Sequence, residues 1–246
     1  MDLDLLWRAE MACRAAWPAD RETDIGGWTA RLSGGSIRRV NSLNQRPQSQ
    51  AIDDRLIDQV EAHYAHFAQP AMVRVMSFAG ASTTTLSRRG YRQEGATTTL
   101  HADMDSRRRA SEPGVTVGPD PHEDWLSARN RIAVSDAALF RAMLDLIEGP
   151  KLFSGADVDG TIRSVAYGVV VDGLLVIESV ATEEGHRGRG LARKSVQSLM
   201  NWAASQGVNE GVLQVVTDNE PARALYRSLG FGRELFDYFY MRQPQT

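Results

Sequence analysis

Apolar and polar residues follow one another along the first half of the chain in patterns that predict both helices and strands. Helical spacing covers Leu3–Ala15 and residues 53–67. Strand spacing covers Trp28–Leu32 and residues 36–43, and the Gly34-Gly35 pair between them could supply the positive backbone angles of a tight hairpin. We expect this half to be completed by a strand over residues 72–78, a short helix ending at Gly90, and a strand over residues 97–104.

The second half shows the same alternation with clearer turn signals. Two Asp-Gly pairs, Asp159-Gly160 and Asp172-Gly173, predict type I′ turns between consecutive strands. The elements expected here are helices over residues 122–134 and 136–147, strands over residues 152–157, 162–171 and Leu174–Thr182, a helix over residues 191–206, a strand over residues 212–216 and a helix between Pro221 and Gly230. Helices and strands thus occur together in both halves of the chain.

A stretch rich in proline, glycine and arginine separates the two halves. It covers residues 103–121, and such a density of helix and strand breakers is typical of a connector. A chain of 246 residues, 42% of them hydrophobic, is long enough to bury one large core or two small ones. We therefore predict two domains, residues 1–111 and residues 112–246.

Charge and cysteine content limit the classes of partner. The chain carries 28 basic and 31 acidic side chains, a net charge of -3, so no basic surface for nucleic acid is expected. Cys13 is the only cysteine, which excludes an intramolecular disulfide and a zinc site of several thiolates. The first ten residues lack the basic start of a signal peptide, and no apolar run approaches the roughly 20 residues of a membrane span. We expect a cytoplasmic protein that does not bind a membrane.

The most informative segment is a loop with two spaced glycines, Gly188 and Gly190, between the strand Leu174–Thr182 and a helix. Glycines at a helix N-terminus let main-chain N–H groups approach a diphosphate. The loop does not match a dinucleotide-binding fingerprint, because Arg193 stands where the third glycine belongs. The basic side chains around it could bind phosphate or could simply be solvated: Arg187, Arg189, Arg193 and Lys194.

Two blocks of sequence carry a resemblance to a known family. The first is Arg187-Gly188-Arg189-Gly190-Leu191-Ala192, and the second runs from Asn219 through Tyr226 to Gly230-Phe231, about thirty residues later. In order and spacing they resemble the GNAT superfamily of acyl-CoA N-acyltransferases, over residues 115–243. The proline frequent before the loop in that family is absent here, where Glu184-Gly185 stands, which puts only detailed contacts in doubt. The resemblance implies that the chain binds acetyl-CoA and transfers its acetyl group to an amine.

The first half looks like a degenerate copy of the second. Residues 86–94 align with residues 226–234, and each segment is a helix that ends on a glycine, followed by an aromatic residue and a strand. The first half lacks the Arg-Gly-x-Gly loop, and the shared segment is also a common arrangement in unrelated chains. The resemblance implies an α/β (α+β) fold with a mixed sheet, built of two GNAT-like domains in tandem. We expect the N-terminal domain to be degenerate and the one cofactor site to lie in the second.

The resemblance assigns cofactor contacts to two segments and one side chain. Main-chain groups of Val180, Ala181 and Thr182 would contact the pantetheine arm and the thioester carbonyl. Asn219 matches a side-chain contact to the pantetheine arm, and it is equally well placed to cap the following helix. The diphosphate would be bound by the loop and the start of its helix: Arg187, Gly188, Arg189, Gly190, Leu191, Ala192 and Arg193.

Two residues are candidates for proton transfer. Tyr226 matches the family position whose hydroxyl faces the cofactor sulfur, and a phenol with a pKa near 10 can protonate a thiolate. The alternative is a core aromatic residue packed with Leu225 and Leu229. Glu178 lies among apolar strand residues, where burial would raise the pKa of its carboxyl group and suit a general base. The alternative is a strand residue that points outward.

These observations predict an N-acetyltransferase that moves an acetyl group from acetyl-CoA to a primary amine of a small molecule. The reaction is expected to proceed by direct attack in a ternary complex and to need no metal. Residues 236–240, a predicted buried strand, could wall the acceptor pocket. A tandem pair can imitate the dimer common in the family, so a monomer is favoured over a dimer. The alternatives are a non-catalytic acyl-CoA-binding or regulatory protein and a protein-modifying acetyltransferase.

Overall fold

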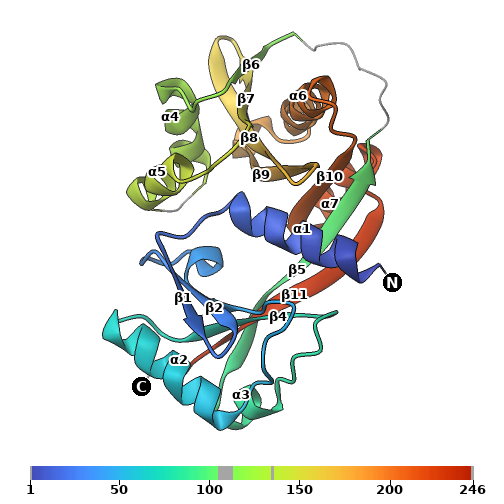
Figure 1. Ribbon diagram of the computed structural model, residues 1–246. Helices are drawn as coiled ribbons and strands as arrows, with labels where there is room; N and C mark the ends of the chain where they lie inside the picture. Colours follow the sequence, from blue (N-terminus) through green and yellow to red (C-terminus); the bar gives the residue numbers. More distant parts are fainter. Residues whose placement is uncertain (1, 105–112, 134–135, 245–246) are drawn as a thin grey trace.

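The computed structural model describes residues 2–104, 113–133 and 136–244 of the chain. The first half forms three helices, five strands and a short 3-10 turn within its described residues (Figure 1). In chain order they are α1 Leu3–Ala15, β1 Arg21–Ile25, β2 Trp28–Leu32, η1 Arg38–Val40, β3 Leu43–Asn44, α2 Asp54–His66, β4 Met72–Met76, α3 Thr84–Arg88 and β5 Arg92–Asp103.

The second half forms four helices, six strands and a second 3-10 turn within the part that the structure describes. In chain order they are β6 Val115–Gly118, α4 Glu123–Ile132, α5 Ala137–Asp145, β7 Lys151–Val158, β8 Thr161–Val171, β9 Leu174–Thr182, η2 Glu184–His186, α6 Leu191–Ser205, β10 Glu210–Val216, α7 Glu220–Ser228 and β11 Arg233–Arg242. Across the described ranges no helix is both long and apolar enough to cross a membrane.

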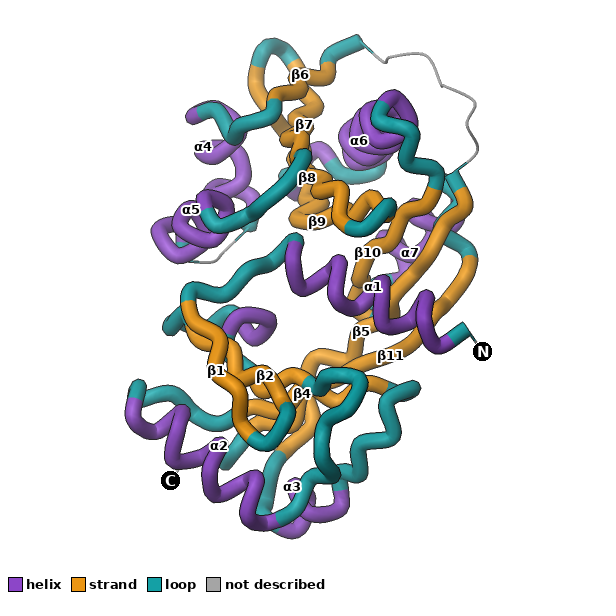
Figure 2. The backbone as a smooth tube through the Cα atoms, in the orientation of Figure 1, coloured by secondary structure: helices purple, strands orange, loops and turns teal. Residues whose placement is uncertain are grey.

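All eleven strands belong to one mixed sheet, in the order β1-β2-β3-β4-β11-β5-β10-β9-β8-β7-β6 (Figure 2). Parallel pairing joins β3 to β4 and β9 to β10, and the other neighbours are antiparallel. The predicted α/β fold with a mixed sheet is confirmed.

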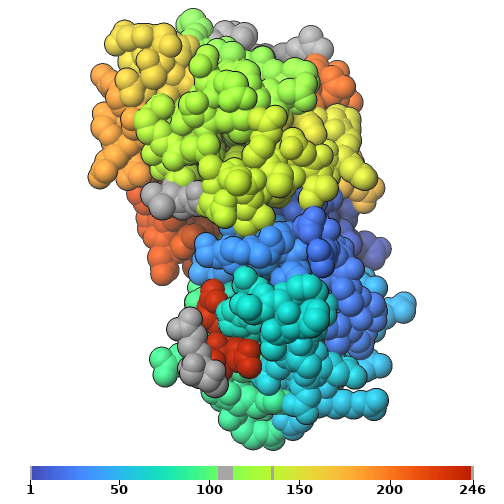
Figure 3. Space-filling view, turned by 90° about the vertical axis from the view of Figure 1, so that its left-hand side faces the viewer, coloured from blue at the N-terminus to red at the C-terminus, as the bar shows by residue number. Residues whose placement is uncertain are grey.

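The two halves exchange their last strands within this sheet. β11, from the end of the chain, lies between β4 and β5, and β5 lies between β11 and β10. The C-terminal residues therefore pack among first-half residues, as Figure 3 shows on the molecular surface. Neither half can complete its sheet alone, so the strand exchange fixes the position of the first half against the second.

Helix α1 lies between the two halves (Figure 1). Its buried face, including Leu6, Ala9 and Cys13, belongs to the same apolar cluster as Phe140 of α5 and Tyr167 of β8. Helices α6 and α7 pack on the other face of the second half, and α2 packs against the strands of the first half. The first half is thus held to the second by a shared core as well as by exchanged strands.

The sequence predicts most elements within two residues, but it places the first hairpin wrongly. The hairpin joins β1 to β2 through Gly26-Gly27, whose φ angles are 59° and 81°, and not through Gly34-Gly35. Residues 36–42 form a loop with a 3-10 turn in place of the expected strand, and only Leu43 belongs to a strand, the two-residue β3. The Asn41 side chain stabilises this loop, because its Oδ1 accepts from the backbone N–H groups of Ser33 and Gly34 at 3.0 and 2.9 Å.

The connector between the halves also differs in part from the expectation. Its C-terminal portion contains β6, which pairs antiparallel with β7 and was not predicted. The predicted domain boundary at residues 111 and 112 lies outside the described residues and stays a prediction. The expected helix over residues 122–134 ends at Ile132, and Val134 is likewise outside the described residues.

The internal repeat has the same hydrogen-bond geometry in both halves. Tyr91 donates its backbone N–H to the Leu86 carbonyl, and Phe231 donates to the Tyr226 carbonyl, each at 3.0 Å. The glycine before each aromatic residue has a positive φ, as expected where a helix ends in a left-handed residue. Leu86 therefore occupies the position that corresponds to Tyr226, so the first half lacks a phenol at that place.

A buried ionic cluster lies under the centre of the sheet. Glu10 of α1 is fully buried, and its Oε1 accepts from Arg14 at 2.7 Å and from Arg74 at 2.5 Å. The Arg74 guanidinium also stacks on the Tyr238 ring, 3.7 Å from its centroid. One carboxylate thus neutralises two buried guanidinium groups that join α1 to β4 and β11.

Glu10→Gln is expected to lower the free energy of unfolding by about 3 kcal/mol, because it leaves two buried cations without a counter-charge. Urea denaturation of the variant and of a control, Glu148→Gln at an exposed position, measures the difference. A loss below about 1 kcal/mol, the usual range for a surface pair, would show that the cluster is not a significant source of stability.

Candidate active site

A bulge in β9 opens the sheet at the centre of the second half. Tyr167 of β8 is opposite Glu178 and Val165 is opposite Ala181, so two residues of β9 face one of β8. Ser179, in the bulge, has a φ of 52°. The pairing of β9 with β10 ends at Ile177, and from there the main chain of β9 is turned away from β10 and lines a groove.

The glycine loop meets α6 at one end of this groove. Gly188 and Gly190 have φ angles of 74° and 78°, and no atom lies within 4 Å of the place where either would carry a Cβ. Gly190 is the N-cap of α6, so main-chain N–H groups of the first turn face open space. Such a turn fits a diphosphate, which needs close main-chain approach and an uncovered helix N-terminus.

The groove has a volume of about 600 Å³ and contains nearly all the predicted cofactor-binding residues. Arg189 is exposed and does not line it. Arg187 donates to the Thr182 carbonyl at 3.3 Å, and Arg193 donates to the Ser228 hydroxyl. The predicted residues that line the groove are Val180, Ala181, Thr182, Arg187, Gly188, Gly190, Leu191, Ala192, Arg193 and Asn219.

Asn219 begins α7 and lies where the groove meets a second cavity. Its Oδ1 accepts from the Ala222 backbone N–H at 3.2 Å, so the helix-capping role is present. The side chain also lines both cavities, which leaves its predicted role in binding the pantetheine arm open.

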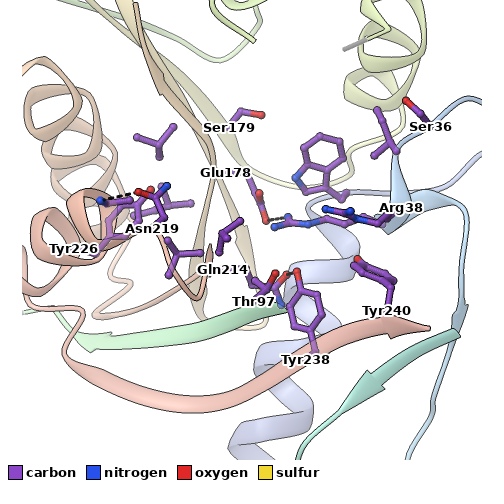
Figure 4. A pocket seen from close by; sticks show the side chains of 18 residues that line it. Ser36, Arg38, Thr97, Glu178, Ser179, Gln214, Asn219, Tyr226, Tyr238 and Tyr240 are labelled. Atoms are coloured by element: carbon purple, nitrogen blue, oxygen red, sulfur yellow. Dashed lines mark hydrogen bonds and ion pairs between the residues drawn. The ribbon is translucent and has the colours of Figure 1, made fainter. Parts of the chain in front are cut away.

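The second cavity, which we call the acceptor cavity, has a volume of about 600 Å³ and adjoins the groove (Figure 4). The two share Val180, Asn219, Ala222 and Tyr226. The first half and the exchanged strand β11 supply much of the acceptor-cavity wall: Trp17, Ser36, Ile37, Arg38, Arg39, Thr97, Tyr238 and Tyr240.

Glu178 points into the acceptor cavity and is only 5% exposed. Its Oε1 accepts from Arg39 at 2.7 Å. Burial raises the pKa of the Glu178 carboxyl group above its usual range, while the Arg39 guanidinium acts in the opposite direction. A buried carboxylate with a raised pKa is suited to accept a proton, and the adjacent Arg39 guanidinium favours its charged, proton-accepting form.

Tyr226 lies in the wall that the groove and the acceptor cavity share. The side chain is 7% exposed, and its hydroxyl has no hydrogen-bond partner among the described residues. Burial raises the pKa of Tyr226 above its usual range, and the negative charge of Glu178 raises it further. The phenol therefore stays protonated and free to donate, as a general acid requires.

Sequence patterns did not indicate the first-half residues of this site. Arg39 contacts Glu178 across 139 positions of sequence, and Arg38 and Trp17 enter the same cavity from the first half. Tyr238 and Tyr240 of β11 line the cavity, in the segment expected to wall an acceptor pocket. The run Ile37-Arg38-Arg39-Val40 suggests a strand, and the glycine pair before it favoured the same interpretation, so no local signal indicated the 3-10 turn that carries Arg38 and Arg39.

Comparisons with known proteins place this fold and site in a class. Over 237 residues the chain is 21% identical to "Uncharacterized N-acetyltransferase YobR" of Bacillus subtilis, covering 93% of this chain and 95% of the relative. A GCN5-related N-acetyltransferase from Kribbella flavida has a similar structure, with a TM-score of 0.69 at 15% identity, covering 97% and 96% of the two chains. A tandem GNAT protein from the clavulanic acid biosynthesis pathway matches with a TM-score of 0.60 at 11% identity, covering 78% and 70%.

The family model that matches residues 6–238, together with these likenesses, defines a GNAT-type N-acetyltransferase, and the predicted superfamily is confirmed. The chain belongs to the family described as "Probable histone acetyltransferase Rv0428c C-terminal", whose model matches residues 6–238. Enzymes of the GNAT class take their acetyl group from acetyl-CoA. The matched residues extend over both halves of the chain.

Proposed function

We propose that this enzyme transfers the acetyl group of acetyl-CoA to a primary amine of a small molecule, by direct attack in a ternary complex. The observation that carries the proposal is the position of Tyr226 in the wall between the groove and the acceptor cavity, with Glu178 inside that cavity. A donor in the groove and an amine in the acceptor cavity would meet at this wall, so no covalent enzyme intermediate is required.

The groove would hold acetyl-CoA, which supplies the thioester. The uncovered N-terminus of α6 would bind the diphosphate, assisted by the charge of Arg187 and Arg193. The unpaired main chain of β9 at Val180 and Ala181 would bind the pantetheine arm and polarise the carbonyl. Gly188 and Gly190 would leave room for the diphosphate, because a side chain at either position would occupy its place.

Glu178 and Tyr226 would move the two protons of the reaction. Glu178 accepts the proton that the amine loses as its nitrogen forms the bond to the acetyl carbon. Tyr226 donates its hydroxyl proton to the sulfur as the carbon–sulfur bond breaks. Arg39 is a positioning residue, because it orients the Glu178 carboxylate and limits the rise of its pKa.

The proposal of a small-molecule acceptor rests on the first half. Ser36, Arg38 and Arg39 of the first half form part of the acceptor-cavity wall, where an open groove would suit a polypeptide. A protein-modifying acetyltransferase and a non-catalytic acyl-CoA-binding protein remain the alternatives. Acetylation of free amines, followed by release of the CoA thiol, distinguishes the enzyme from both.

The cofactor site is tested by titrating acetyl-CoA into the protein and into Gly188→Trp in a calorimeter. Micromolar binding, worth about 8 kcal/mol, is expected for the wild type and should disappear in the variant, because the indole would fill the helix N-terminus.

Gly207→Trp is the matched control for this titration. Gly207 has the same left-handed backbone, with a φ of 78°, and the same open surroundings, but it lies after the other end of α6. Both variants carry the same backbone strain, so binding lost only in Gly188→Trp identifies the site. A wild-type protein that does not bind acetyl-CoA would contradict the proposed function.

A further inference from the structure

The acceptor cavity contains one cation that proton transfer does not use. Among the described residues that line it, Arg38 and Arg39 are the basic side chains and Glu178 is the only acidic one. Arg39 is paired with Glu178 at 2.7 Å. Arg38 therefore contributes an additional positive charge to the cavity wall.

The surrounding residues hold Arg38 in place without neutralising it fully. Its guanidinium lies over the Tyr240 ring, 5.5 Å from the centroid, and against Gly95, where a Cβ would be 2.9 Å from the Arg38 Cζ. The nearest carboxylate, Glu94, is 3.6 Å away and already accepts from Arg242 at 3.0 Å. The Arg38 side chain keeps 41% of its surface exposed, so a ligand can reach its charge.

Tyr240 adds an unsatisfied polar group beside this cation. The residue is 2% exposed, and its hydroxyl has no hydrogen-bond partner within the described part of the chain. Figure 4 shows Arg38 and Tyr240 together on one side of the cavity, Tyr226 and Asn219 on the other, and Glu178 between them. A guanidinium next to a free phenol is suited to bind an oxyanion, because both donate hydrogen bonds and an unpaired buried hydroxyl is costly.

We propose that the acceptor is an amine that also carries an anionic oxygen group, a carboxylate or a phosphate. The anionic group binds Arg38 and Tyr240, and the amine faces Glu178 and Tyr226. A polyamine does not fit, because the described lining offers no second carboxylate for a second ammonium group. This inference rests on the proposed function and names the substrate class of the same site.

The test compares anionic amines with neutral amines of matched length, at saturating acetyl-CoA. The anionic set is glycine, β-alanine, 4-aminobutyrate, 6-aminohexanoate and O-phosphoethanolamine, and the neutral set is the corresponding alkylamines. We expect kcat/KM for the best anionic amine to exceed that of its neutral partner roughly 10- to 100-fold, the range for a charge-assisted hydrogen bond. The carboxylate and phosphate members identify which group the site prefers.

Arg38→Gln is expected to remove most of this preference, and Tyr240→Phe to reduce it in the same direction. The matched control is Arg88→Gln, an exposed arginine of the first half that lines neither cavity, whose preference should equal that of the wild type. The proposal would be overturned by any of three results. These are equal rates for anionic and neutral amines, a preference that persists in Arg38→Gln, and spermidine as the best acceptor.

A binding measurement keeps this test independent of catalysis. N-acetyl-β-alanine and N-acetyl-4-aminobutyrate are titrated into the protein saturated with CoA, beside their neutral amide counterparts. If an anionic product binds to the wild type and this binding is lost in Arg38→Gln, the anion subsite is supported. A failure to acetylate any amine would then contradict only the proposed function. If neither anionic product binds more tightly than its neutral counterpart, the subsite is wrong.

Discussion

Replacing Glu178 by glutamine should lower kcat roughly 10²- to 10³-fold, the usual range for loss of a general base, with acetyl-CoA affinity unchanged. Glutamine keeps the shape of the side chain and can still accept the hydrogen bond from Arg39, but it cannot take a proton from the amine. The measurement is steady-state thiol release, with calorimetry for acetyl-CoA, at a fixed concentration of the best acceptor.

The pH dependence provides a second readout for Glu178. The base acts in its deprotonated form, so the rate should fall as the pH drops through its pKa. Burial raises that pKa, which places the acid limb of the wild-type profile above the usual glutamate range of about 4.3. The limb should be absent from Glu178→Gln. Removing Arg39 should move the limb to higher pH, because its guanidinium lowers the Glu178 pKa.

Glu184→Gln is the control for Glu178, because Glu184 is an exposed acid in the loop that follows the same strand. Its kcat should stay within about twofold of the wild type, the range of an ordinary surface change of up to ~0.5 kcal/mol. If Glu178→Gln keeps its activity and its acid limb, another group removes the proton. The carboxylate would then have only the structural role of pairing with the partly buried Arg39.

The cofactor side of the site, formed by β9, the glycine loop and α6, could be predicted from the sequence because local signals determine it. The Asp-Gly turns defined β8 and β9, and the two glycines before Leu191 defined the start of α6. Each of these depends on the backbone preferences of a few neighbouring residues. The line from β9 through the loop to α6 therefore appears in the structure as expected, with the predicted loop residues along the groove except for Arg189.

The other half of the site depends on contacts that no local pattern specifies. Arg39 reaches Glu178 only because α1 and the exchanged strands hold the first half against the second. The strand order also depends on long-range contacts. The sequences of β5 and β11 are those of ordinary strands, and nothing in them indicates that each strand pairs with strands of the other half. The strand expected over residues 36–43 was wrong: the Asn41 side chain accepts hydrogen bonds from Ser33 and Gly34 and holds this segment as a loop.

The first half forms part of the site that lies in the second half. It has Leu86 at the position that corresponds to Tyr226, and its sequence has no Arg-Gly-x-Gly loop. It contributes wall to the acceptor cavity, with Arg38 and Arg39 in adjacent positions of one 3-10 turn. In the proposed mechanism Arg38 faces the acceptor and Arg39 positions Glu178. Substrate choice would then depend on a segment outside the cofactor motif.

Replacing Tyr226 by phenylalanine should lower kcat roughly 10²- to 10³-fold, which corresponds to about 3 to 4 kcal/mol in the barrier. The ring and its packing with Phe231 remain, so folding and acetyl-CoA affinity should change little. Only the proton for the departing sulfur is lost. Because burial and Glu178 raise the phenol pKa, the wild type should show no alkaline limb from Tyr226 within the ordinary assay range.

Tyr91→Phe is the matched control for this change. It removes a phenol hydroxyl from the corresponding helix end of the first half, where the hydroxyl donates to Glu61 at 3.0 Å. Its kcat should equal that of the wild type, so a loss confined to Tyr226→Phe would separate proton donation from any effect of removing a tyrosine hydroxyl.

A Tyr226→Phe enzyme with a kcat within about threefold of the wild type, a loss below the 10²-fold minimum for general acid catalysis, would show that the sulfur takes its proton from another group. Tyr226 would then only separate the donor from the acceptor. Direct transfer would remain the proposed reaction, with another group as the general acid.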